Sequence, residues 1–242
     1  MRLSFLLAAF FAMAALAQSP PPRLTLTQRG IAAKNPAEAV KWFRKAAEQN
    51  DALAEYYLGN HYFAGIGVSQ NVAEAYKWYR KAADQNLAEG QCNVGICYEY
   101  GYGVPKNAVE ACKWYQKAAE QNDPLAQYNL GNHYASGEGV PQDKVEAYKW
   151  LALAAAQQQA QAMDALQVIS PQLSADQLAN AQRLVQEFKS VGRPPHSMAS
   201  AFPSDLASEP NNKSVTSPLP APIQEFWIEE SPTPAPTPLH PK

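Results

Sequence analysis

Net charge is the first thing that this sequence lacks. The 242 residues include 20 Lys and Arg against 22 Asp and Glu, which gives a formal net charge of −2 at pH 7. Proteins that bind nucleic acid or anionic membrane surfaces carry basic patches, whereas here the Lys and Arg residues are spread around the predicted helices. We therefore expect neither nucleic acid nor a charged membrane surface as a partner.

Long hydrophobic runs are also lacking, apart from one at the start of the chain. Arg2 precedes an apolar stretch over residues 3–16, and Ala15-Leu16-Ala17 offers a small-x-small cleavage site. This order of features is typical of a secretory signal peptide, which we place at residues 1–17. The run is short for a membrane span, which needs about 20 residues, although an uncleaved anchor is the alternative. We expect an exported protein, periplasmic or secreted, with no integral membrane segment after signal removal.

Histidine is too rare to build a catalytic or metal centre. The four histidines are His61, His133, His196 and His240. His61 and His133 hold the same position two repeats apart, so with helices packing about 8–10 Å apart they are expected to be about 20 Å distant. Catalysis needs a nucleophile, a base or a metal set that converges on one point. We therefore predict no catalytic residue, no metal and no cofactor.

Cysteine is scarce and confined to one repeat, at Cys92, Cys97 and Cys112. An exported compartment permits a disulfide, and at most one pair can form within the chain. Cys92 and Cys97 are five residues apart on one predicted helix and poorly placed for each other, so Cys112 would have to be one partner, as in a Cys97–Cys112 pair. The alternatives are that the three residues are small apolar fillers, or that an odd thiol pairs between chains.

What the sequence does contain is a repeat with a period of 36 residues. Around each repeated Trp the same Ala residues return, three positions before and four positions after it. The tryptophans are Trp42, Trp78, Trp114 and Trp150. Self-similarity at this period marks a stack of two-helix units, because no unit can bury its apolar face alone.

Helix caps return in the same register. A cap residue is followed three positions later by Glu, as in Asn35-Pro36-Ala37-Glu38, and the same pattern begins at Asn71, Asn107 and Asp143. Such caps predict the second helix of each unit at about 36–49, 72–85, 108–121 and 144–157. The Glu residues also precede a Lys by three positions, a spacing suited to solvated ion pairs.

The first helix of each unit is marked by an interior glycine. Gly59, Gly95 and Gly131 each follow an apolar residue and precede a Tyr by three positions. Glycine inside a helix costs about 1 kcal/mol relative to Ala, so its return predicts a close approach of a neighbouring helix, over which that Tyr can lie. The Gly-x-Gly-Val segments that follow predict left-handed helix ends.

These motifs together resemble the Sel1-like repeat family. The pattern A-x-x-x-L-G-x-x-Y-x-x-G-x-G-V, then N/D-x-x-E-A-x-x-W-Y-x-x-A-A, is matched almost position by position over residues 54–83 and 126–155. The resemblance implies an all-α fold, a right-handed superhelical solenoid of antiparallel αα-hairpins, and for most members an adaptor role. Some cysteine-rich exported relatives are associated with β-lactam binding or hydrolysis, but they place a Cys pair in every repeat, which this chain does not.

The flanks complete the predicted organisation. Residues 18–30 are expected to be an extended lead-in, residues 31–189 the solenoid of about three full repeats and half units, and residues 174–189 its C-terminal capping helix. Of the 20 prolines, 12 lie in the last 52 residues, so residues 190–242 are expected to be a disordered Pro-rich tail. Within it, Phe226 and Trp227 are a candidate docking motif; the alternative is an isolated apolar patch.

The first helices are expected to line an inner groove. Positions three before, one after and four after each interior glycine should face it, and these hold aromatic and amide side chains suited to a protein or peptide ligand. The candidates are Tyr56, Asn60, Phe63, Ile96, Glu99, Tyr128 and Asn132. A core role for some of these aromatics is the alternative. We predict a noncatalytic adaptor that binds a protein or peptide; the alternatives are a cell-wall or β-lactam hydrolase and a passive spacer.

Overall fold

The described part of the structure, a computed structural model, covers residues 24–190 and is helical, with no strand in this range. The helices are α2 (Leu26–Ile31), α3 (Pro36–Ala47), α4 (Ala52–Ala64), α5 (Val72–Asp84), α6 (Ala88–Tyr100), α7 (Ala108–Glu120), α8 (Pro124–Ser136), α9 (Lys144–Ala156), α10 (Ala160–Ile169), the 3-10 helix η1 (Ser170–Gln172) and α11 (Ala175–Ser190). Within this range no helix is both long enough and apolar enough to cross a membrane.

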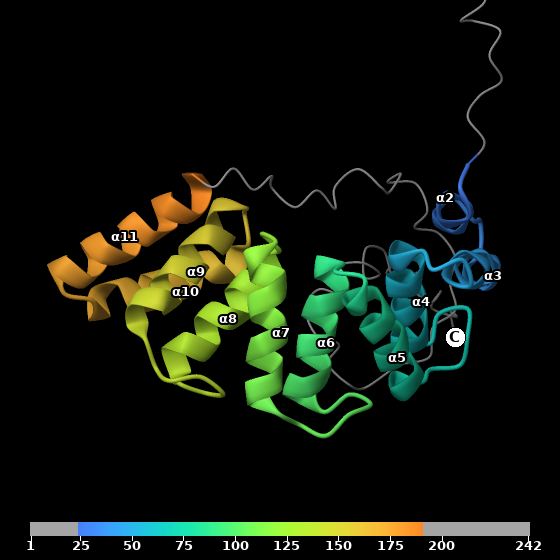
Figure 1. Cartoon of the computed structure of the whole chain (residues 1–242), viewed down its shortest axis with the longest axis horizontal. Coiled ribbons are helices and arrows are strands. Elements are labelled where there is room, and N and C mark those ends of the chain that lie inside the picture. The colour runs from blue at the N-terminus through green and yellow to red at the C-terminus, as the bar shows by residue number, and fades with distance from the viewer. Residues whose placement is uncertain (1–23, 191–242) are drawn as a thin grey trace, which may run out of the picture.

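The helices form a solenoid of hairpins in a row, from α2 and α3 at one end to α10 and α11 at the other (Figure 1). The helix pairs α4–α5, α6–α7 and α8–α9 pack within hairpins, and α3–α4, α5–α6 and α7–α8 pack between them. The predicted all-α solenoid is therefore confirmed. We call α4, α6 and α8 the first helices, and the side that they turn away from α5, α7 and α9 the first-helix face.

The predicted caps of the second helices are present. The side chains of Asn35, Asn71 and Asn107 each accept a hydrogen bond from the backbone N–H of the Glu three residues later, at 2.8–3.1 Å. Asp143 caps α9 in the same way. In α5, α7 and α9 those Glu side chains pair with the Lys three residues on, at 2.6–3.0 Å. Local sequence thus sets where these helices begin.

The interior glycines mark close approaches, as predicted, but another side chain fills the contact. A Cβ built on Gly59 or Gly95 would lie 2.6 Å from the ring of Tyr79 or Tyr115, and one on Gly131 would lie 2.7 Å from Cγ of Leu151. These three residues follow the repeated Trp and belong to the second helix of the same hairpin. The Tyr three positions after the glycine, which we expected over this contact, is not the neighbour.

The prediction of an extended lead-in over residues 18–30 is wrong at its C-terminal end, because residues 26–31 form the helix α2. Thr25 and Gln28 make a reciprocal capping box at its start, a signal that the sequence contains. Gly30 lies against the ring of Phe43 in α3, with a built Cβ at 2.5 Å, so α2 acts as a shortened first helix. The half unit before the first full repeat is therefore a hairpin.

A row of side-chain amides, which the sequence analysis missed, ties the hairpins together. At the end of each second helix a Gln donates to the start of its own first helix: Gln121 to Gln91 at 2.7 Å, and Gln157 to Gln127 at 3.0 Å. Gln157 also donates to Asn122 of the preceding hairpin at 3.1 Å. The equivalent bond between hairpins joins Gln121 to Asn86 at 3.3 Å, so the bonds to Asn recur with the period of the repeat and link one hairpin to the next.

Gln158 is expected to be a weak point of the last hairpin turn. It has a φ of +68°, at the position where the other turns have Asn50, Asn86 and Asn122. Left-handed backbone costs a side chain other than Gly or Asn about 1–2 kcal/mol. Since Gln158 is exposed, Gln158→Gly should raise the free energy of unfolding by about 0.5–1 kcal/mol.

Urea denaturation of the full chain measures this difference. The matched control is Gln167→Gly, at an exposed position inside α10, which should lower stability by about 1 kcal/mol. A loss of stability from Gln158→Gly would contradict the assignment of strain to this residue.

The predicted terminal cap of the solenoid is present as α11, which packs on α9. Ser174 and Gln177 form the reciprocal cap at its start. Ala181 and Val185 are buried, and the Phe188 ring meets Trp150 edge-on at 5.5 Å between centroids. One side of α11 therefore covers the end of the core.

Candidate functional site

The structure buries most of the residues predicted to line the groove. Tyr56, Asn60, Phe63 and Ile96 are each at most 7% exposed. The Tyr79 hydroxyl donates to Oδ1 of Asn60 at 2.7 Å, and the Phe63 ring meets Tyr102 of the next hairpin at 5.1 Å. In this structure these four side chains are not open to a partner, in keeping with the alternative of a core role, because periodicity gives the direction of a side chain but not what covers it; their role in binding stays a prediction. Glu99, Tyr128 and Asn132 are half-buried and reach solvent.

An aromatic cluster that the sequence analysis missed lies at the end of α6 that enters the Gly101–Gly103 loop. Tyr100 is 50% exposed, and its ring stacks on Tyr102 at 5.7 Å and 23° between planes. Partial burial, followed by the Glu99 carboxylate and to a smaller extent by Tyr102 and by Tyr128 of α8, raises the pKa of the Tyr100 hydroxyl to about 12. We call Glu99, Tyr100, Tyr102 and Tyr128 the Tyr100 patch.

The signal for this patch was present in the repeat comparison. Tyr100 stands where the other first helices have Ala64 and Ser136, and Tyr102 stands where the other loops have Ile66 and Glu138. The two positions depart from the repeat together, which marks one place on the first-helix face where the chain carries extra aromatic surface.

Beneath the patch, Glu99 meets His133. The His133 Nε2 atom lies 3.7 Å from Oε2 of Glu99, its Nδ1 faces the Glu138 carbonyl at 2.8 Å, and the Tyr115 hydroxyl donates to Glu99. Burial opposes a charge on the imidazole, but hydrogen bonds with Cys112, Glu99 and the Glu138 carbonyl outweigh it and raise the pKa of His133 to about 10. Burial would raise the pKa of Glu99, yet its hydrogen bonds with His133 and Tyr115 hold it below the ordinary value.

His61 holds the same repeat position two hairpin units earlier, with other residue types around it. Its Nδ1 likewise faces a loop carbonyl, that of Ile66, at 2.7 Å. The position that corresponds to Cys112 is Val40, and that of Tyr115 is Phe43, whose ring lies 5.5 Å from the His61 ring. Burial lowers the pKa of His61. The two histidines therefore favour opposite protonation states.

The three cysteines are free thiols, so the Cys97–Cys112 disulfide is not formed in this structure. Cys97 packs in the core cluster with Tyr79, and burial raises its pKa to about 12. Cys112 is turned to the other side of its hairpin and donates to the Glu138 carbonyl at 3.5 Å. Cys112, His133 and Glu99 thus form a contact between three helices, but the thiol is only 3% exposed.

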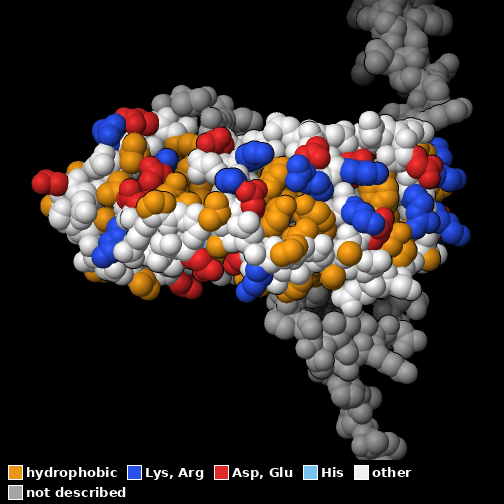
Figure 2. Space-filling model, turned by 60° about the horizontal axis from the view of Figure 1, so that its bottom comes forward, with side chains coloured by type: hydrophobic (Ala, Val, Ile, Leu, Met, Phe, Trp, Pro, Cys, Tyr) orange, Lys and Arg blue, Asp and Glu red, His pale blue; other side chains and the backbone are white. Residues whose placement is uncertain are grey.

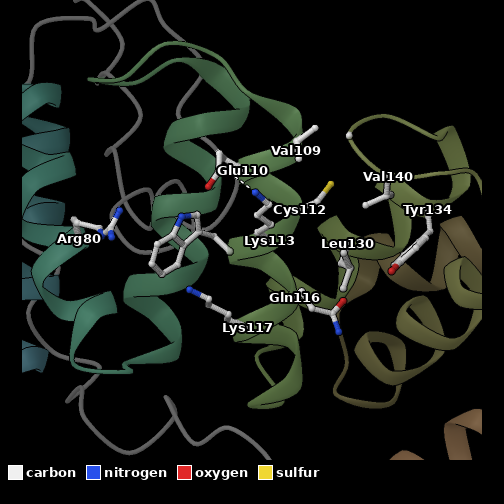
Figure 3. Close-up of a pocket in the computed structure, with 12 residues that line it drawn as sticks. Arg80, Val109, Glu110, Cys112, Lys113, Gln116, Lys117, Leu130, Tyr134 and Val140 are labelled. Carbon is white, nitrogen blue, oxygen red and sulfur yellow. Dashed lines mark hydrogen bonds and ion pairs between the residues drawn. The ribbon is translucent and has the colours of Figure 1, made fainter.

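A hollow of about 750 Å³ lies beside α7 on the side of the second helices (Figure 3). Trp114 lies between two cations, with Arg80 and Lys117 at 4.7 and 3.9 Å from its ring. Figure 2 shows Lys and Arg side chains gathered over the half of the molecule that holds α7, α5 and α3. Arg80 is paired with Asp84 at 2.9 Å, and Lys113 with Glu110 at 2.6 Å. Two of the cations that line the hollow are thus matched by carboxylates, and Lys117 stands over the Trp114 ring.

The remaining predictions concern metal ligands and two segments outside residues 24–190. No group of His, Cys, Asp and Glu in this range could hold a metal ion. The predicted signal peptide at 1–17 and the candidate docking motif at Phe226 and Trp227 lie outside the described residues.

Known proteins resemble this chain over its repeats. The Sel1 repeat model matches residues 11–51, 52–87, 88–123 and 124–158, more than half of the chain. Among solved structures, the chain is similar to a Sel1 repeat protein from Oxalobacter formigenes, with 38% identity over 52% of this chain and 94% of that one, at a TM-score of 0.49. It is also similar to c5321, a protective antigen of uropathogenic Escherichia coli strains displaying an SLR fold, with 30% identity over 68% of this chain and 44% of that one, at a TM-score of 0.49. The comparison with curated proteins finds no match.

Proposed function

The chain belongs to the Sel1 repeat family, whose members are generally protein-interaction scaffolds, and from this premise we propose that it holds a partner protein on the open part of its first-helix face. The observation that carries the proposal is the Tyr100 patch. Large aromatic side chains that are rigid and partly exposed supply most of the energy of protein interfaces. Tyr100 and Tyr128 offer such surface, and Asn132 adds an amide for hydrogen bonds with a peptide backbone.

The charge of this face sets the chemistry of the partner. The helices α4, α6 and α8 contain no Lys or Arg, whereas Glu99 is half-exposed beside Tyr100. An extended segment with an apolar side chain and no acidic flank fits this face, since the charge of Glu99 is matched by His133 and these helices offer an acidic flank no Lys or Arg. We propose a noncatalytic role in an exported compartment, in keeping with the predicted signal peptide.

Crosslinking capture from the native source tests this proposal with the full chain. Tyr100→Ala/Tyr128→Ala should lower recovery of the captured partner at least tenfold, because truncating an aromatic anchor typically costs 2 kcal/mol or more. Lys77→Ala/Lys113→Ala, on exposed positions of the second helices, should leave recovery unchanged. Equal capture by all forms would contradict the proposed surface, and no capture by any form would favour a passive spacer.

The alternative in another class is a β-lactam-directed or cell-wall hydrolase. It is favoured by one observation, the contact of Cys112 with His133 and Glu99, which are residue types used in nucleophilic catalysis. The near-complete burial of Cys112 opposes it. Incubating the full chain with a chromogenic β-lactam decides between the two, since turnover that Cys112→Ser abolishes would replace the scaffold proposal.

A further inference from the structure

The hollow beside α7 lies where two large side chains of the repeat are replaced by others. Two positions before the repeated Trp, α5 and α9 have Tyr76 and Tyr148, whereas α7 has Cys112. Two positions after it, α5 has Arg80, whereas α7 has Gln116. Cys112 and Gln116 both line the hollow. The space therefore opens where this repeat lacks an aromatic ring and a guanidinium group.

The tyrosine three positions after each interior glycine shows what the third full hairpin lacks. In the first full hairpin, Arg44 donates to the hydroxyl of Tyr62 at 3.0 Å. In the second, the hydroxyls of Tyr76 and Tyr98 lie 3.2 Å apart, and their rings meet edge-on at 6.0 Å between centroids. In the third, Tyr134 lines the hollow with its hydroxyl turned toward α7 (Figure 3). Among residues 24–190 this hydroxyl has no hydrogen-bond partner and the ring meets no other ring.

One side of the hollow is apolar and the other is cationic. Val109 and Leu130 line it on the side of Tyr134, and Val109 is 49% exposed. On the other side, the ammonium group of Lys117 lies 3.9 Å from the centre of the Trp114 ring, and no carboxylate of the described range pairs with it. A ligand that spans the hollow must therefore offer both apolar surface and negative charge.

We propose that the hollow binds a protein segment in which a tyrosine adjoins an acidic residue. The tyrosine ring takes the place that Tyr76 has against Tyr98: it meets Tyr134 edge-on and exchanges a hydrogen bond with its hydroxyl. The acidic neighbour pairs with Lys117, which gives up no carboxylate of its own chain. The volume of about 750 Å³ lies within the usual range of ligand sites.

This inference goes beyond the proposed function, because the hollow lies on the side of the second helices and not on the first-helix face. The two surfaces also differ in the charge that they accept. The first-helix face offers an acidic segment no Lys or Arg, whereas the hollow offers Lys117. The chain can therefore hold two different segments at once.

An NMR titration of the isotope-labelled full chain tests the proposal. The probe is a synthetic peptide with the sequence Glu-Tyr-Glu-Gly, acetylated and amidated at its ends. We expect saturable shifts of backbone amide signals in α7 and at Gly139 and Val140, which line the hollow. A peptide with Lys in place of each Glu should bind at least tenfold more weakly.

Two pairs of variants locate the binding. Cys112→Tyr refills the hollow with the side chain of the neighbouring repeats and should raise the dissociation constant at least tenfold, whereas Cys112→Ser keeps it open and should change it less than twofold. Val109→Glu, at the exposed rim, should weaken binding at least threefold, and Val109→Lys should strengthen it. The Val109 pair decides the matter if Cys112→Tyr does not fold.

Four results would each overturn the inference: unchanged affinity in a folded Cys112→Tyr, no effect of charge at position 109, shifts confined to the first-helix face, or no saturable shift. The variant Tyr100→Ala/Tyr128→Ala should bind the probe as the parent does. Because the titration uses no captured partner, its failure leaves the proposed function standing, and a failed capture experiment leaves this inference standing.

Discussion

Replacing Gly95 by Ala is expected to lower the free energy of unfolding by about 2 kcal/mol. In an ordinary helix interior the same change raises it by about 1 kcal/mol. Here the new Cβ would lie 2.6 Å from the Tyr115 ring, which is fully buried and is held at its other end by the hydrogen bond from its hydroxyl to Glu99. The ring can move aside only by losing that bond, so the steric cost outweighs the gain in helix propensity.

The third full hairpin supplies a matched control for this prediction. Gly131→Ala would meet Cγ of the buried Leu151 at 2.7 Å and the Ala147 carbonyl at 3.2 Å, but Leu151 has no hydrogen bond to lose when it shifts, so the loss of stability should be smaller than for Gly95→Ala, about 1 kcal/mol. Both variants are measured by urea denaturation of the full chain. The double variant Gly95→Ala/Tyr115→Leu imitates the third hairpin and should be more stable than the sum of its single changes predicts. A Gly95→Ala protein as stable as the parent would contradict the close approach.

Local signals explain why so much of the fold could be predicted. The caps at Asn71 and Asn107 and the glycines that end the first helices act within one helical turn, and the fixed period repeats each of them. The helix α2 was missed for the opposite reason. The loop between α2 and α3 is shorter than the loops that contain the Gly-x-Gly-Val segments, so Gly30 lies out of step with the period although it performs the same packing role.

The candidate site was harder to predict because it depends on contacts between hairpins. Periodicity correctly indicated that Tyr128 and Asn132 share a face, but it gave no information on the burial of Tyr56 and Asn60. The Glu99–His133 pair joins two first helices that are adjacent in the stack, and it relies on the Tyr115 hydroxyl from the helix between them. The position of a residue within its repeat predicts a contact between hairpins only when the neighbouring repeats have the same sequence. The repeats that contain Glu99 and His133 differ in sequence.

The Glu99–His133 pair should make the stability of the protein fall at alkaline pH. His133 has a folded-state pKa of about 10, above its ordinary value, so the folded state binds a proton more tightly than the unfolded chain does. Its contribution is therefore complete below about pH 6.5, the unfolded value, and is lost as the pH rises through about 10. His61 acts with the opposite sign: its pKa is lowered, so its contribution is complete above about pH 6.5 and is lost as the pH falls.

Histidine ring signals in an NMR titration of the full chain separate the two residues, with His133→Gln and His61→Gln as assignment controls. We expect midpoints near pH 10 for His133 and below 6.5 for His61. Glu99→Gln should lower the His133 midpoint, because it removes a charge that favours the imidazolium, and should leave His61 unchanged. If His133 titrates near pH 6.5, or if Glu99→Gln does not move it, the two residues do not form an ion pair.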